Sequence, residues 1–131
     1  MTKSYVAAWP EERTRLLLKE PGVEKEIHLT TFFDKGEELE GMTPASWEGP
    51  QFAKVTKVTL WYAGRSRHIV AEVEAPWAAQ IHGHYAAQSR LKHPAFRPHV
   101  TLKRDCGWSE LGNFVHLVGM TLAFERHGKE A

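Results

Sequence analysis

The feature that most limits the possible folds is an alternating segment in the middle of the chain. Residues 54–62 (KVTKVTLWY) and 68–74 (HIVAEVE) alternate apolar and polar side chains, and residues 63–67 (AGRSR) separate them. A period of two on both sides of a glycine-containing connection predicts an antiparallel β-hairpin. The fold must therefore contain a sheet with one face in a core.

The remaining segments predict further strands, two helices and one long loop. Strands are expected at 5–9, 27–33, 99–104 and 114–125, the last with Gly119 as a bulge. Helices are expected at 11–19, before the breaker Pro21-Gly22, and from Pro76 to about Leu91. Residues 34–50 carry many acidic residues with Gly and Pro, which predicts a surface loop long enough for a lid or binding role.

This order of elements predicts one α+β domain over residues 1–131. The elements run strand–helix–strand, hairpin, helix–strand–strand, without a linker or a low-complexity segment. A length of 131 residues, with 42% hydrophobic and 25% charged side chains, suits one well-buried core and argues against disorder.

Charge and cysteine content narrow the classes of function. The net charge of +1 excludes a protein that holds duplex DNA by bulk charge, although residues 51–131 carry a net +5 that favours a small anionic ligand. A single cysteine, Cys106, permits no internal disulfide and suits a reducing cytosol. The sequence has no signal peptide pattern and no apolar run of membrane-spanning length, so we expect a cytoplasmic protein with no membrane partner.

Two of the expected strands carry the same signature, His28-Leu29-Thr30 and His99-Val100-Thr101. Residues two apart on a strand share a face, so each His and its Thr point away from a core that takes Leu29 and Val100. Continuing the alternation adds Phe32 and Lys103 to the polar face. Tyr5 and Trp9 share a face of the first strand. That face either approaches the cleft that would hold the two motifs or packs in the core.

This set of side chains suits phosphodiester chemistry. Two imidazoles can divide the proton transfers, one deprotonating the attacking oxygen and the other protonating the leaving oxygen. The Thr30 and Thr101 hydroxyls can hold phosphate oxygens, Lys103 can offset negative charge, and Phe32 can stack on a base. The scheme requires no metal and no cofactor. The other histidines, including His82 and His84, lack the spacing of a metal site. We expect His82 and His84 to lie on a solvent-facing helix.

The two motifs resemble those of the 2H phosphoesterase superfamily, with Ile27–Thr30 as the first and Arg97–Leu102 as the second. The resemblance implies a bilobal, pseudo-symmetric fold: antiparallel sheets flanked by short helices, with a central cleft that holds one motif from each half. It also implies that His28 and His99 are the general acid and base, that Thr30 and Thr101 hold the phosphate, and that no metal takes part.

The small size, the start Tyr5–Pro10 and the short gap between the motifs are similar to phage anti-CBASS phosphodiesterases. That resemblance implies a cyclic di- or trinucleotide immune signal as substrate, cleaved in the host cytoplasm. The alternatives are a phosphodiesterase for 2′,3′-cyclic phosphates or 2′-5′-linked RNA ends, and a non-catalytic sponge that binds a cyclic nucleotide. Substrate-binding residues are expected to be Tyr5, Trp9, Phe32 and Lys103.

Overall fold

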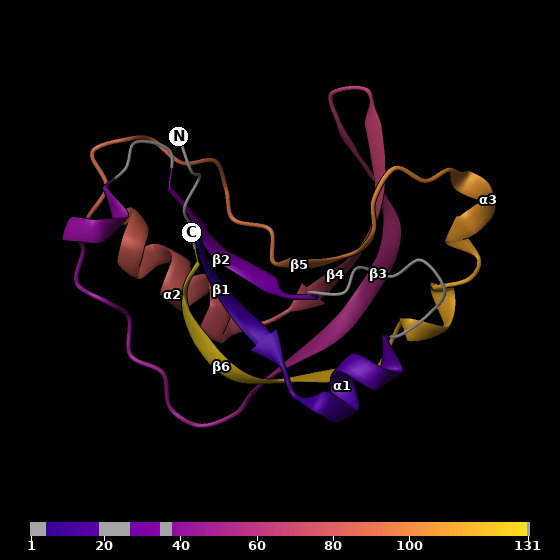
Figure 1. Cartoon of the computed structure of the whole chain (residues 1–131), viewed down its shortest axis with the longest axis horizontal. Helices are drawn as coiled ribbons and strands as arrows, with labels where there is room; N and C mark the ends of the chain where they lie inside the picture. Colours follow the sequence, from indigo (N-terminus) through magenta and orange to yellow (C-terminus); the bar gives the residue numbers. More distant parts are fainter. Residues whose placement is uncertain (1–4, 19–26, 35–37, 131) are drawn as a thin grey trace.

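The hairpin predicted from the middle of the chain is the longest part of the fold. In the computed structural model, which describes residues 5–18, 27–34 and 38–130, β3 (Gln51–Ala63) pairs antiparallel with β4 (Ser66–Glu74). The connection is a tight turn of two residues, Gly64 and Arg65, and is shorter than expected. Gly64 has φ 63°, a left-handed conformation that glycine adopts without the steric cost of a side chain. The turn end of the hairpin projects from the rest of the molecule in Figure 1.

The other expected elements are present with shifted bounds. The strands are β1 (Tyr5–Pro10), β2 (Leu29–Phe33), β5 (His99–Lys103) and β6 (Thr121–Glu130). The α-helices are α1 (Glu12–Leu17), α2 (Pro76–Ala86) and α3 (Trp108–Leu111), and the 3-10 turns are η1 (Leu39–Gly41) and η2 (Val115–Leu117). The α2 helix ends five residues before the expected Leu91, and α3 was not predicted. Lys19, Pro21 and Gly22, expected to end the first helix, lie outside the described residues.

The strands of the described residues form one closed antiparallel barrel in the order β1-β2-β5-β4-β3-β6 (Figure 1). The predicted α+β fold of two lobes around a central cleft is therefore wrong. The architecture is mostly β, with a few short helices attached. Its sheet has no free edge, so it does not divide into two halves with an open groove between them.

The last strand closes the barrel, and its position differs from the prediction of 114–125. The first part of β6, Thr121–Phe124, pairs with β3, and the part from Phe124 to Glu130 pairs with β1. Residues 125–130 (ERHGKE) are polar, so their pattern does not resemble a strand. Backbone hydrogen bonds with β1 hold them in the sheet. Gly119, expected as a bulge, instead has φ 90° in the junction between η2 and β6.

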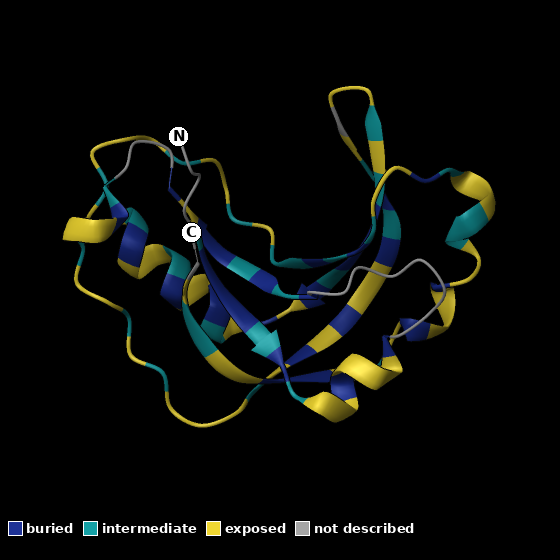
Figure 2. Cartoon of the chain, in the orientation of Figure 1, coloured by how far each residue is buried: buried dark blue, intermediate teal, exposed yellow. Residues whose placement is uncertain are grey.

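Alternating apolar side chains fill the barrel. Leu29, Val55, Ile69, Val100 and Phe124 are fully buried, and the banding of buried and exposed residues along the strands is visible in Figure 2. Burial of each such side chain contributes about 1.5–3 kcal/mol. Because the residues between them point outward, each strand presents a second set of side chains on the barrel exterior.

The segment from residue 38 to 50 is held against α2. Thr43 N–H donates to Gln88 Oε1 (2.7 Å) and Ala45 N–H donates to the Tyr85 hydroxyl (3.0 Å). In Figure 1 the segment runs along the α2 side of the molecule before it enters β3. Within the described part of the chain, no helix is long and apolar enough to cross a membrane.

Candidate active site

The barrel brings the two His-x-Thr motifs onto neighbouring strands. β2 pairs antiparallel with β5, and Leu29 lies opposite Val100. One residue further in each direction, this register places His28 opposite Thr101 and Thr30 opposite His99. His28 immediately precedes β2. Directly opposed residues of an antiparallel pair typically have Cβ atoms about 4.5–5.5 Å apart, so this register makes each imidazole the expected neighbour of the hydroxyl of the other motif.

The four motif side chains lie on the outside of the barrel. Leu29 and Val100 are both 0% exposed and belong to the core, so the alternation turns their neighbours outward. His28, Thr30, His99 and Thr101 are all half-buried. In this register the two histidines are diagonal neighbours, for which the typical separation is about 7–8 Å.

His99 is held in a defined tautomer. Its Nδ1–H donates to the Arg97 carbonyl oxygen (2.9 Å), which leaves the lone pair of the neutral ring on Nε2. Burial is the main cause that lowers the pKa of His99, and the positive charges of Arg97 and His28 lower it further. The hydrogen bond to the Arg97 carbonyl and the charge of Glu72 oppose this shift. The net result favours a neutral imidazole, the form that accepts a proton.

An aromatic and charged cluster surrounds His99. The Trp61 ring lies 4.2 Å from the His99 ring, and the Arg97 guanidinium sits over Trp61 at 4.5 Å. Arg97 Nη2 also donates to Glu72 Oε1 (3.0 Å). A cavity of about 400 Å³ opens beside this cluster, and Lys57 is part of its lining. The site therefore joins a base-competent imidazole to a pocket that is lined by two cations, Lys57 and Arg97, and by the half-buried Trp61 ring.

Trp61 and Glu72 are site residues that the sequence analysis missed. Both lie in the hairpin. Trp61 of β3 pairs with His68 of β4, and Glu72 of β4 pairs with His99 of the neighbouring strand β5. The alternation of residues 54–62 predicts that Trp61 points away from the core. Its position beside His99 depends on the pairing of β3 with β4 and of β4 with β5.

Of the two positions open to Tyr5 and Trp9, the core or the candidate site, the structure places both rings beside His28. The Tyr5 ring stacks on His28 at 5.2 Å, and the Trp9 ring lies 6.5 Å from it. The register of β1 with β2 pairs Ala8 with Leu29, so that Trp9 comes next to His28 on the same outer face. Both predicted residues therefore reach the candidate site.

Phe32 does not reach the candidate site, and the prediction that Phe32 faces a ligand beside His28 is wrong. Its side chain is 2% exposed and packs 4.7 Å from the His93 ring and 5.5 Å from the Tyr85 ring. It belongs to a second core cluster, together with Val6 of β1. A ring buried in this way has no free face for a nucleobase.

A β-bulge is the cause of this difference. Ala7 pairs with Thr30 but the preceding Val6 pairs with Phe32, so Thr31 is an extra residue on β2. The extra residue shifts the alternation by one position, and both Thr31 and Phe32 become buried. The alternation of the sequence already breaks at Thr30-Thr31, but the pattern alone does not show which residue is the extra one or that Phe32 turns into the core.

Lys103 stays on the half-buried face of β5 but its ammonium is engaged elsewhere. It forms an ion pair with Glu110 of α3. The hydrogen bond from the Lys103 ammonium is the largest cause that lowers the pKa of Glu110. The hydrogen bond that the carboxylate accepts from Gly107 N–H lowers it further. The structure therefore places the Lys103 charge against a carboxylate and not over the two imidazoles.

The remaining histidines are not arranged as a metal site. Among the residues that the structure describes, no three His, Cys, Asp or Glu side chains are grouped so that they could hold a metal ion. His82 is half-buried instead of solvent-facing: its ring stacks on Phe96 at 4.5 Å and its Nδ1–H donates to the Thr31 carbonyl (2.9 Å).

Comparisons with known proteins do not assign the chain. Neither the family models nor the curated proteins contain a match.

Proposed function

We propose that this protein is a metal-independent phosphodiesterase of the two-histidine type that cleaves a nucleotide phosphodiester. The observation that carries the proposal is the β2–β5 register, which gives each motif histidine the threonine of the other motif as its cross-strand neighbour. Two strands far apart in the sequence thus contribute a symmetric set of two imidazoles and two hydroxyls on one outer face.

The arrangement supports an in-line transfer at phosphorus. In a 3′-5′ linkage, the ribose 2′-oxygen forms a bond to phosphorus and the bond from phosphorus to the 5′-oxygen breaks. Neutral His99 takes the proton of the 2′-hydroxyl through Nε2, and protonated His28 gives a proton to the leaving 5′-oxygen. Thr30 and Thr101 donate hydrogen bonds to the non-bridging oxygens, where negative charge develops. The products are a 2′,3′-cyclic phosphate and a 5′-hydroxyl.

The surroundings of the two histidines support a nucleotide as the substrate. Tyr5 and Trp9 lie beside His28, Trp61 lies beside His99, and flat aromatic side chains commonly hold bases by stacking. Arg97 and Lys57 provide positive charge on the His99 side. Among nucleotides, the resemblance of the two motifs and of residues 5–10 favours a cyclic di- or trinucleotide.

The test is turnover in EDTA with a panel of cyclic di- and trinucleotides, 2′-5′ oligoadenylate and 2′,3′-cyclic mononucleotides. Products are identified by liquid chromatography and mass spectrometry. We expect a cyclic di- or trinucleotide to be linearised, and His28→Asn and His99→Asn each to reduce the rate by about 100-fold or more. His116→Asn, at an exposed position in η2, is the matched control and keeps the activity.

The other outcomes separate the alternatives. Turnover of only the 2′,3′-cyclic or 2′-5′ substrates would indicate an RNA-end phosphodiesterase instead. Binding of a cyclic nucleotide without turnover, retained in His99→Asn, would indicate a sponge. If no member of the panel is bound or consumed, the proposal is wrong.

A further inference from the structure

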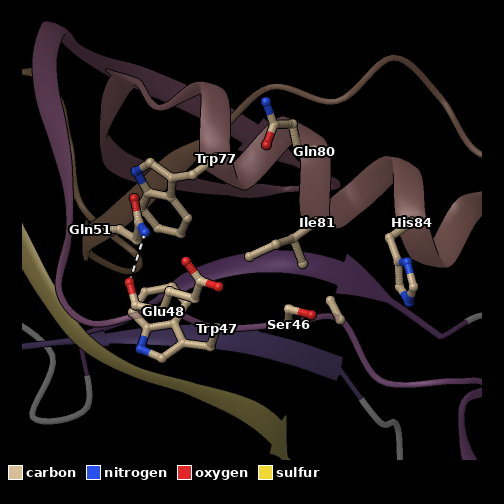
Figure 3. A pocket seen from close by; sticks show the side chains of 9 residues that line it. Ser46, Trp47, Glu48, Gln51, Trp77, Gln80, Ile81 and His84 are labelled. Carbon is tan, nitrogen blue, oxygen red and sulfur yellow. Dashed lines mark hydrogen bonds between the residues drawn. The ribbon is translucent and has the colours of Figure 1, made fainter.

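A second cleft lies between α2 and the segment that leads into β3, and none of the residues that line it belongs to the two motifs. It has a volume of about 350 Å³ and is enclosed by the segment 45–51 on one side and α2 on the other (Figure 3). The α2 helix contributes Ala78 to the core that also contains Leu29. The cleft shares no lining residue with the pocket beside His99 and contains neither His28 nor Thr30, so it is a distinct site.

Two tryptophans form a corner of the cleft. The rings of Trp47 and Trp77 lie 5.6 Å apart at 79° to each other. Both indole N–H groups are already bonded to backbone oxygens, Trp47 to Glu125 (3.3 Å) and Trp77 to Phe52 (2.7 Å). These bonds fix the rings, so that what the two side chains offer to a ligand is aromatic surface.

Two of the polar side chains that line the cleft, those of Gln51 and His84, offer acceptors. Gln51 donates its amide N–H to the Glu48 carbonyl oxygen (3.0 Å), which leaves its amide oxygen as an acceptor. His84 donates Nε2–H to the Thr43 carbonyl (2.8 Å), which leaves the lone pair of the neutral ring on Nδ1. The Glu48 carboxylate points into the cleft in Figure 3 and is its one formal charge among the lining residues when His84 is neutral.

We infer that this cleft binds an organic cation of the alkylammonium class, independently of the proposed phosphodiesterase activity. Aromatic faces, a carboxylate and unpaired acceptors all attract positive charge, and apolar substituents on the nitrogen match the indole surface. The chain already uses this chemistry internally, with Arg97 over Trp61 and Arg126 over Trp9 at 4.3 Å. A phosphate or carboxylate ligand would be repelled by Glu48.

The walls of the cleft are set before a ligand arrives. Bonds from Thr43 and Ala45 attach the loop to Gln88 and Tyr85, close to the cleft. The Trp47 ring is also stacked on His127 at 5.5 Å and 14°. Binding therefore requires little ordering of the protein, which favours affinity for a small ligand.

The inference is tested with choline as the probe. Its titration into ¹⁵N-labelled protein at constant ionic strength is followed through the five indole N–H signals, one for each tryptophan. We expect saturable shifts of the Trp47 and Trp77 signals and no shift of Trp108, which is exposed in α3. The neutral isostere 3,3-dimethylbutan-1-ol is expected to bind at least about 5-fold more weakly, since it lacks the charge that the rings and Glu48 attract.

Two variants make the test specific. Glu48→Gln should raise the dissociation constant of choline about 5-fold, whereas Glu40→Gln, an exposed carboxylate in η1, should leave it unchanged. His99→Asn should also leave it unchanged, so a failure of the proposed phosphodiesterase activity and a failure of this site are separate results. Equal binding of the neutral isostere, no saturable shift of Trp47 and Trp77, or an unchanged constant in Glu48→Gln would each overturn the inference.

Discussion

Acidification should destabilise the barrel through His127 of β6. Thr31 donates its hydroxyl hydrogen to the Val6 carbonyl (3.1 Å), so its oxygen accepts the Nε2–H of His127 (2.9 Å). The neutral ring is satisfied in this tautomer, with Trp47 stacked on it. Burial lowers the pKa of His127 from 6.5 to about 4, because a charged imidazolium would lose its hydration there.

The magnitude follows from proton linkage. Below pH 6.5 the unfolded chain takes up a proton at His127 that the folded chain does not bind, so stability falls as the pH falls. Each pKa unit corresponds to about 1.4 kcal/mol, which gives an upper limit of about 3 kcal/mol at pH 4. The ring is only half-buried, and solvent screening reduces the effect to about 1 kcal/mol at pH 5. The loss occurs between pH 6.5 and about 4 and adds nothing further below that range.

Urea unfolding at pH 7 and pH 5 measures this loss. His127→Gln keeps an N–H donor for Thr31 but cannot take up a proton, so the free energy of unfolding should depend less on pH than in the unchanged protein. Some dependence remains because the pKa of His99 is also lowered. His116→Gln is the control at an exposed position and should keep the full dependence. An undiminished pH dependence in His127→Gln would refute the reasoning.

Three further predictions concern the β2–β5 pair. Arg97→Gln should raise the pKa of His99, because the Arg97 charge lowers that pKa. The Cε1–H signal of the His99 ring in an NMR pH titration measures the change. An unchanged or lower pKa would contradict the prediction. Thr101→Val should reduce turnover about 100-fold while Thr101→Ser stays within a few-fold, as steady-state rates will show, since only the hydroxyl can hold a phosphate oxygen. Leu29→Ala should lower the free energy of unfolding by about 2–5 kcal/mol, because Leu29 is 0% exposed opposite Val100; a loss below about 1 kcal/mol in urea unfolding would show that this contact does not hold the strands together.

Local pattern alone determined much of what the chain forms. The period of two in residues 54–74 specified the hairpin, and the motif alternation specified that Leu29 and Val100 face a core while the histidines and threonines face away. These features depend only on the geometry of an extended strand, in which successive side chains point to opposite sides. They could therefore be read without knowing which strands pair.

The tertiary structure decided which strands meet and where the alternation breaks. Residues 125–130 carry no strand pattern, yet their backbone closes the barrel against β1, so two separate lobes do not form. The bulge at Thr31 turns Phe32 into the core, and Glu110 takes the ammonium of Lys103.

The candidate active site likewise depends partly on local pattern and partly on tertiary structure. Each His-x-Thr motif is visible in the sequence, but their cross-strand register exists only because β2 and β5 become neighbours. Backbone hydrogen bonds do not depend on side-chain identity, and the contacts of Trp61 and Glu72 with the site join strands distant in sequence. Information of that kind is absent from a local pattern and arises only when the barrel closes.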